Sequence, residues 1–146
     1  MVITVRPLAE RDEARWRELF DGYVRFYEED VPAEIVDLTW HRLLHQNDNM
    51  AGLVAVDEAD RVVGFAALVF HRSTWSPTWY CYLEDLFVDL AVRGKGVGQA
   101  LIEATYAEAD RRGASRTYWA TQAGNATARR LYDRVAVLTE FVQYRR

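Results

Sequence analysis

The chain has 146 residues, half of them hydrophobic, a net charge of −4 and a single cysteine. This length predicts one folded domain, residues 1–146, around one core. The negative charge argues against a protein that coats nucleic acid, and the lone cysteine excludes an internal disulfide framework. No run approaches the roughly 18 apolar residues of a membrane helix, and no apolar stretch follows a basic N-terminus. We therefore expect a cytoplasmic protein with neither a nucleic-acid nor a membrane partner.

The first half of the chain predicts a strand, two helices and two strands, over residues 2–7, 9–27, 33–45, 52–56 and 62–70. The first strand alternates apolar with polar residues and stops at Pro7. Both helices carry apolar residues at helical spacing, and Pro32 separates them. The two later strands flank a polar turn at 57–61, which is typical of a hairpin.

The second half predicts a strand, a helix, a strand, a helix and a strand, over residues 79–88, 97–112, 115–122, 125–135 and 140–146. Gly113 is a typical C-terminal stop for the first of these helices, and Asn125 can cap the second. The full order is β-α-α-β-β-β-α-β-α-β. It predicts an α/β fold, a mixed sheet with helices that cover it.

Three alternating glycines, Gly94, Gly96 and Gly98, lie beside Arg93 and Lys95 between a predicted strand and a predicted helix. Glycine allows positive φ and a close approach of a ligand to the backbone, and a helix N-terminus favours an anion. The segment therefore predicts a phosphate site. It contains neither a Walker A motif nor a dinucleotide fingerprint. A glycine-rich turn without a ligand is the alternative.

Two adjacent acids, Glu84 and Asp85, lie inside the predicted strand 79–88. Strict alternation puts Tyr82, Glu84, Leu86 and Val88 on one face and Leu83, Asp85 and Phe87 on the other. A buried carboxylate is costly unless it has a partner or a reaction to serve. From the pattern alone, a functional site and an edge strand with solvated acids are equally consistent.

Two motifs together resemble the cofactor-binding motifs of the GNAT superfamily of N-acetyltransferases. They are Arg93-x-x-Gly96-x-Gly98 and Asn125-x-x-Ala128-x-x-Leu131-Tyr132. With "YLEDLFV", the chain is most similar in motif to the spermidine/spermine and thialysine acetyltransferase branch, which acts on polyamines and histones. The resemblance covers nearly the whole chain. It implies a splayed central sheet, acetyl-CoA as cosubstrate and a homodimer.

The resemblance also assigns the cofactor contacts. The main chain of Leu86, Phe87 and Val88 is expected to pair with pantetheine as an added strand would. The pyrophosphate is expected at Arg93, Gly94, Lys95, Gly96, Val97, Gly98 and Gln99. Asn125 and Arg129 would complete the cleft.

Acetyl transfer to an amine sets the catalytic expectations. An alkylamine with a pKa of about 10.4 must lose a proton before it attacks, and the departing thiolate must gain one. Glu84 is the expected base, directly or through a water, and Tyr132 the expected acid. On helical spacing alone Tyr132 is a core residue, and only the motif match assigns it a reaction.

The acceptor is expected to meet Asp85, Tyr27, Glu28 and Trp75, because acids with aromatic faces suit an ammonium group. A solvated acidic loop is an equally good interpretation of the segment around Glu28. We expect direct transfer to a small cationic or lysine-like primary amine in a ternary complex. A non-catalytic acyl-CoA sensor is the alternative. No metal site is expected.

Overall fold

The computed structural model describes residues 1–146 and contains one five-stranded sheet in the order β1-β2-β3-β4-β5. The strands are β1 Thr4–Pro7, β2 Met50–Val56, β3 Val62–His71, β4 Trp79–Val88 and β5 Ala114–Tyr118. The first four strands are antiparallel to their neighbours, and β5 runs parallel to β4. A mixed sheet follows, as the sequence predicts.

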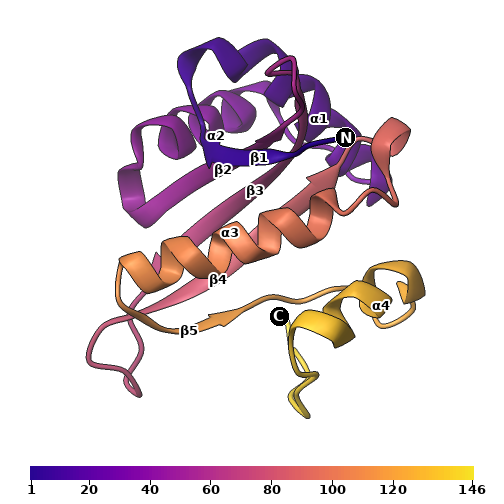
Figure 1. The fold of residues 1–146 in the computed structure, drawn as a ribbon. Coiled ribbons are helices and arrows are strands. Elements are labelled where there is room, and N and C mark those ends of the chain that lie inside the picture. The colour runs from indigo at the N-terminus through magenta and orange to yellow at the C-terminus, as the bar shows by residue number, and fades with distance from the viewer.

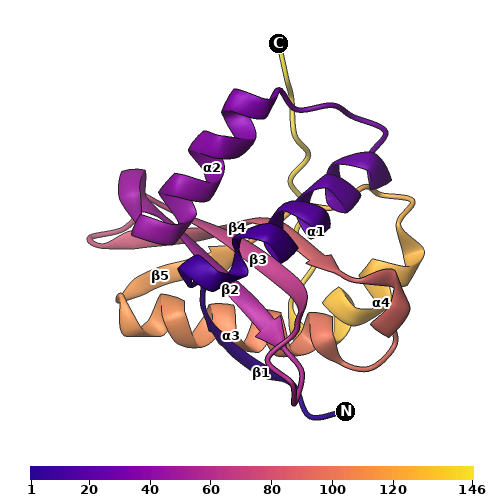
Figure 2. The ribbon, with the colours of Figure 1, turned by 90° about the horizontal axis from the view of Figure 1, so that it is seen from above.

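The α-helices are α1 Glu13–Phe26, α2 Ala33–His45, α3 Val97–Arg111 and α4 Ala126–Val135. Short 3₁₀ helices cover Glu10–Asp12, Asn47–Asn49 and Leu90–Val92. Helices α1 and α2 lie on one face of the sheet and α3 lies on the other, while α4 follows β5 at the end of the fold (Figures 1 and 2). No helix combines the length and the apolarity needed to cross a bilayer.

The hydrophobic core has one half on each face of the sheet. Under α1 and α2, Trp16 stacks on Phe20 at 4.9 Å between ring centroids and packs against Trp40 and Phe65. Under α3, fully buried Leu101 and Ile102 pack on the opposite face. The apolar residues whose spacing predicted these helices therefore form one buried stripe on each helix.

Strands β4 and β5 separate after a short common stretch. Their pairing begins at Trp79 and Ala114 and ends where Tyr82 meets Tyr118. Beyond Tyr82, the β5-side edge of β4 has no partner strand, which leaves backbone groups as far as Val88 open on that side. This is the splayed sheet that the resemblance implied.

A β-bulge in β4 changes which residues share a face. Ala67 pairs with Asp85 and Leu68 pairs with Leu83, so Glu84 is the extra residue of the bulge. Leu83 belongs to the α3 side of the core, whereas Phe87 belongs to the α1 side. The predicted alternation is therefore wrong beyond Tyr82, and Asp85 lies on the same face as Tyr82.

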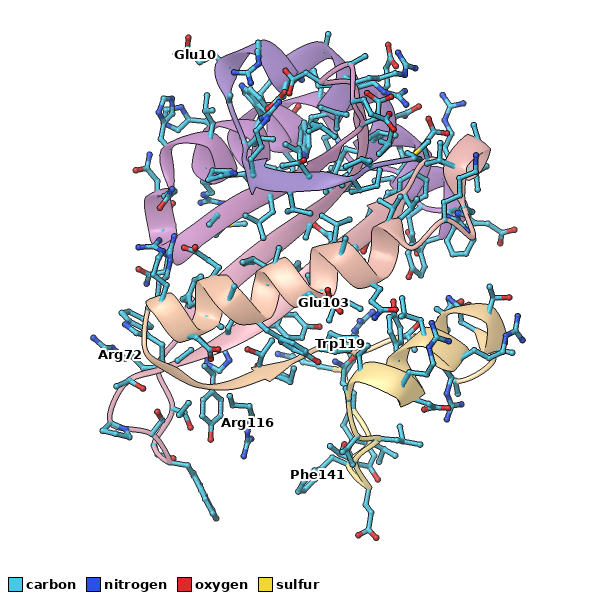
Figure 3. All side chains as sticks on the ribbon, viewed as in Figure 1. Glu10, Arg72, Glu103, Arg116, Trp119 and Phe141 are labelled. Atoms are coloured by element: carbon cyan, nitrogen blue, oxygen red, sulfur yellow. The ribbon has the colours of Figure 1, made fainter.

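The predicted last strand, 140–146, is wrong. Residues after α4 form no strand, and Val137, Phe141, Val142 and Tyr144 are exposed (Figure 3). Their alternation is typical of a strand, but a strand needs a paired edge, and residues 140–146 pair with no strand of the sheet. The preceding strand is also shorter than predicted and ends at Tyr118.

Candidate active site

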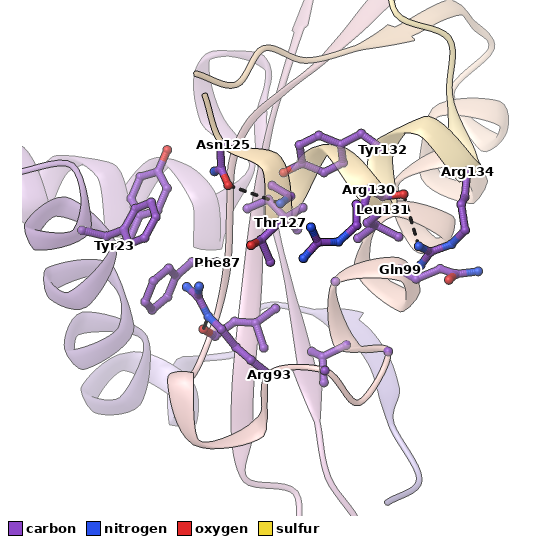
Figure 4. A pocket seen from close by; sticks show the side chains of 18 of the residues that line it. Tyr23, Phe87, Arg93, Gln99, Asn125, Thr127, Arg130, Leu131, Tyr132 and Arg134 are labelled. Carbon is purple, nitrogen blue, oxygen red and sulfur yellow. Dashed lines mark hydrogen bonds between the residues drawn. The ribbon is translucent and has the colours of Figure 1, made fainter. Parts of the chain in front are cut away.

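A cavity of about 370 Å³ opens where β4 and β5 separate. Its walls come from the end of β4, the loop before α3, the first turn of α3, one side of α4 and the end of α1 (Figure 4). Of the cofactor residues expected from sequence, it is lined by Leu86, Phe87, Val88, Arg93, Gly94, Gly96, Val97, Gly98, Gln99 and Asn125. Segments far apart in the chain thus meet in one place.

The glycine loop is shaped as an anion cradle. Gly94 and Gly96 have φ of +80° and +81°, a conformation that L side chains rarely adopt, and a Cβ on either would meet no atom within 4 Å. Gly96 is the N-cap of α3, whose first N–H groups have no acceptor within the helix. The positive helix end and its free donors therefore face open space.

Three arginines add positive charge to this cavity. Arg93, Arg130 and Arg134 line it, and none of them forms an ion pair with a carboxylate. The Arg93 guanidinium lies 5.4 Å from the centroid of Phe87, and its Nε donates to the Val88 carbonyl at 3.3 Å. In a chain of net charge −4, unpaired arginines at a helix N-terminus indicate a phosphate ligand.

Two of the expected cofactor residues lie elsewhere. Arg129 Nη1 donates to the Ala123 carbonyl at 2.7 Å, and neither Arg129 nor Lys95 lines the cavity. Asn125 does line it, and its side chain also accepts from the Ala128 N–H at 3.2 Å. Asn125 therefore caps α4 and fixes where this helix presents its side chains.

The cavity is closed at one end by aromatic residues of α1. Tyr27, expected there from sequence, is joined by Tyr23 and Phe26. Glu28 is exposed and lies two residues past the end of α1, with a φ of +56°. Trp75 is 88% exposed in the loop before β4, at the opposite end of that strand from the cavity. The structure brings neither Glu28 nor Trp75 into the cavity wall.

The two acids of β4 have different surroundings. Glu84 is exposed, whereas Asp85 is largely buried beside Tyr23. Burial raises the pKa of Asp85 to about 6, and the neighbouring Glu84 charge adds to the shift. Glu84 also contributes to the raised pKa values of Tyr82 and Tyr118, after burial. Both carboxylates therefore lie close to Tyr82.

Tyr132 lies on the α4 wall of the cavity, and its ring packs edge-on against Trp119 with 5.4 Å between centroids. Burial raises the pKa of Tyr132, with a smaller contribution from Tyr27. The hydroxyl thus stays protonated at neutral pH and can donate to an anion. Figure 4 shows Tyr132 and Tyr23 on opposite walls of the cavity.

The one cysteine is unsuited to nucleophilic catalysis. Cys81 is fully buried on the α3 side of the sheet, and burial raises its thiol pKa to about 11. A reactive cysteine needs a lowered pKa and access to substrate. No three metal-ligating side chains come together in the chain.

Comparison with known proteins gives matches over nearly the whole chain. A family model described as the acetyltransferase (GNAT) family matches residues 16–136. The D-amino-acid N-acetyltransferase HPA3 of Saccharomyces cerevisiae is 34% identical over 145 residues, which are 99% of this chain and 90% of the yeast protein.

Solved structures share the fold at lower sequence identity. The structure of AAC(6')-Iy with the bisubstrate analogue CoA-S-monomethyl-acetylneamine has a TM-score of 0.85 at 20% identity, covering 100% of this chain and 98% of that one. The ribosomal-protein-alanine N-acetyltransferase of Brucella melitensis biovar Abortus 2308 has a TM-score of 0.79 at 22% identity, covering 98% and 97%.

Proposed function

The chain belongs to the acetyltransferase (GNAT) family and is an acetyl-CoA-dependent N-acetyltransferase, and on this premise we propose that it acetylates a primary amine by direct attack in a ternary complex. One observation carries the proposal. Both motifs converge on a single cavity, in which an anion cradle lies beside an open strand edge and a protonated tyrosine. Because the family and its yeast member are enzymes, the non-catalytic sensor is set aside.

The residues of the cavity fit acetyl-CoA in two ways. The open edge of β4 at Leu86 and Val88 can pair with amides, although the Val88 carbonyl already accepts from Arg93 Nε at 3.3 Å, and the glycine loop is free to bind a diphosphate. When bound, acetyl-CoA supplies an acetyl group activated as a thioester. Arg130 and Arg134, which also line the cavity, extend the positive surface available to its phosphates.

Two proton movements are assigned to side chains. Glu84 takes the proton from the acceptor ammonium, directly or through a water, so that the neutral amine can attack. Asp85, negative at neutral pH, holds the ammonium beforehand. Tyr132 gives its hydroxyl proton to the departing thiolate, whose conjugate pKa is about 8.5. Solvent returns a proton to Tyr132 and removes one from Glu84.

For the acceptor we propose a small cationic or lysine-like amine, which includes amino acids. The yeast relative is named for D-amino acids, so the similarity supports an amine-bearing acceptor without singling out polyamines. We further propose a homodimer. The exposed apolar side chains of residues 137–144 support it, because exposed apolar groups in one segment favour burial against a partner.

Replacing Glu84 by glutamine, or Tyr132 by phenylalanine, should lower kcat about 100-fold while leaving the Kd for acetyl-CoA within about twofold. Each change removes one proton transfer and keeps the shape of the side chain. Single-turnover release of coenzyme A, measured with a thiol reagent and a panel of primary amines, tests both variants. Full activity of both with an accepted amine would contradict the assigned roles.

A further inference from the structure

One face of the β4–β5 pair carries opposite charges at its two ends. We infer that the acceptor is an amine that also carries a carboxylate, and that Arg116 binds this carboxylate. The inference rests on the proposed function and adds the acceptor class and a residue to it. We call the surface made by Tyr80, Tyr82, Glu84, Asp85, Arg116 and Tyr118 the acceptor face.

The pairing of the strands places these residues together. Tyr80 and Tyr82 pair across the sheet with His71 and Val69, on the face opposite to buried Phe70. In the parallel pair, Tyr80 lies beside Arg116 and Tyr82 lies beside Tyr118. The bulge then keeps Asp85 on this face instead of turning it toward α3. Because α2 packs on β2 and α1 on β3 and β4, β5 lies outside their cover.

Arg116 is an exposed cation without a partner. It takes part in no ion pair and no side-chain hydrogen bond, and its guanidinium lies 4.4 Å from the centroid of Tyr80. Stacking on an aromatic ring restrains the guanidinium and leaves its edge free to bind a carboxylate. Arg72 lies at the same end of the strands but on the other face, 3.7 Å from the ring of Trp79, which packs on the α3 side (Figure 3).

The acidic end of the acceptor face is at Glu84 and Asp85, four and five residues along β4 from Tyr80. Four residues of strand span about 13 Å between Cα atoms, a gap into which the long side chains of Glu84 and Arg116 can reach. An ammonium held by the acids therefore has a cation within reach of a carboxylate on the same small molecule. A zwitterion complements this face at both ends.

A polyamine complements only one end. Its second ammonium would extend from the acids toward Arg116, where like charges repel. Between the charged ends, the Tyr82 and Tyr118 rings lie 4.8 Å apart, and the Tyr118 hydroxyl is hydrogen-bonded to His71 Nε2 at 2.5 Å. These fixed rings offer apolar surface to the side chain of an amino acid.

The experiment compares each amino acid with its own amide, which removes the carboxylate charge and keeps size and amine. The acceptors are phenylalanine and phenylalaninamide in both enantiomers, lysine and lysinamide, and spermidine. The proteins are the wild type, Arg116→Gln, Arg116→Lys and, as a control, Arg112→Gln. Arg112 also stacks on an aromatic ring, 4.5 Å from the Phe70 centroid, but Phe70 lies on the α3 face.

The wild type should acetylate at least one acid with a lower KM than its amide. Arg116→Gln should raise the KM for the acid about tenfold, the loss expected for one charge-assisted hydrogen bond. The KM for the amide should stay within about twofold of the wild-type value. Arg116→Lys should recover part of the lost affinity for the acid. Arg112→Gln should leave the KM values for both the acid and the amide unchanged.

Two results overturn the inference while leaving the acetyltransferase intact. One is a wild type that prefers the amides or spermidine in every comparison. The other is an Arg116→Gln variant whose KM rises equally for the acid and for its amide. Failure to acetylate any amine in the panel, by contrast, contradicts the proposed function itself, and the inference with it.

Discussion

Valine in place of Gly96 should raise the Kd for acetyl-CoA at least tenfold and destabilise the fold by about 1–3 kcal/mol, the cost of a strained backbone conformation. Gly96 has a φ of +81°, which a β-branched residue strongly disfavours. Either the loop keeps its shape under strain, with a side chain in the anion cradle, or it relaxes and moves the N–H groups of α3. Calorimetric titration and thermal unfolding measure the two effects.

Gly113→Val is the matched control for this variant. Gly113 follows the C-terminal end of α3 and has a φ of +73°. A Cβ at this position would likewise meet no atom within 4 Å. It should therefore lose similar stability without losing affinity for acetyl-CoA. If the two valine variants bound acetyl-CoA equally well, the glycine loop would not be the diphosphate site.

Asparagine in place of Asp85 should give a protein that is more stable at pH 8 and a poorer enzyme. The Asp85 carboxyl has a pKa of about 6 instead of its ordinary 3.8, so the native state binds this proton more tightly than the unfolded chain. Stability is consequently lost as the pH rises from about 4 to about 6, by up to about 3 kcal/mol. The neutral amide avoids that cost.

The same substitution should raise the acceptor KM about 10- to 100-fold at pH 8, since it removes a charge from a site of low polarity. The wild-type acceptor KM should rise as the pH falls through 6, and this rise should vanish in Asp85→Asn. Tyr23, Tyr27 and Tyr82 lie close to Asp85, and the neighbouring Glu84 charge adds to the raised pKa of Asp85.

Unfolding temperatures at pH 4 and pH 8 decide the stability half of this prediction. Asp85→Asn should exceed the wild type at pH 8 and match it at pH 4, where both side chains are neutral. Equal stability at both pH values, together with an unchanged acceptor KM, would show that Asp85 is neither buried in its charged form nor in contact with the acceptor.

The part of the cavity that we propose for the cofactor could be located from sequence because its signals are local. Gly94, Gly96 and Gly98 with Arg93 occupy one short segment between a strand and a helix, and such a segment determines its own backbone geometry. The Asn125 motif is equally compact, since one cap fixes the register of α4. The helices followed their apolar periodicity in the same way.

The acceptor half depends on contacts between distant strands, which the sequence pattern does not show. The bulge at Glu84 follows from the pairing of β3 with β4, and it moved Asp85 to the face opposite from Leu83. Trp75 was expected at the acceptor because aromatics cluster around β4, yet the strand carries it to the far end of the sheet. Periodicity gives the face of a regular strand only.

Arg134 is a cavity residue that the sequence analysis missed. The Asn125 motif ends before it, so no sequence signal marked it, although α4 turns it into the cavity with Arg130. The predicted strand over residues 140–146 is wrong for the opposite reason. Their alternation is genuine, but alternation does not tell whether a segment docks on a sheet edge, and residues 140–146 pair with no strand.

The central claim is that the N-terminus of α3 and its glycine loop bind the diphosphate of acetyl-CoA. It is tested most directly by calorimetric titration of the wild type with acetyl-CoA and with S-acetylpantetheine, which carries the same thioester but lacks the diphosphate together with the 3′-phosphoadenosine attached to it. We predict saturable binding of one acetyl-CoA per chain, and binding of S-acetylpantetheine at least about 30-fold weaker, as expected for the loss of charge-assisted hydrogen bonds. Equal affinity for the two compounds, or no binding of acetyl-CoA at millimolar concentration, would contradict the claim.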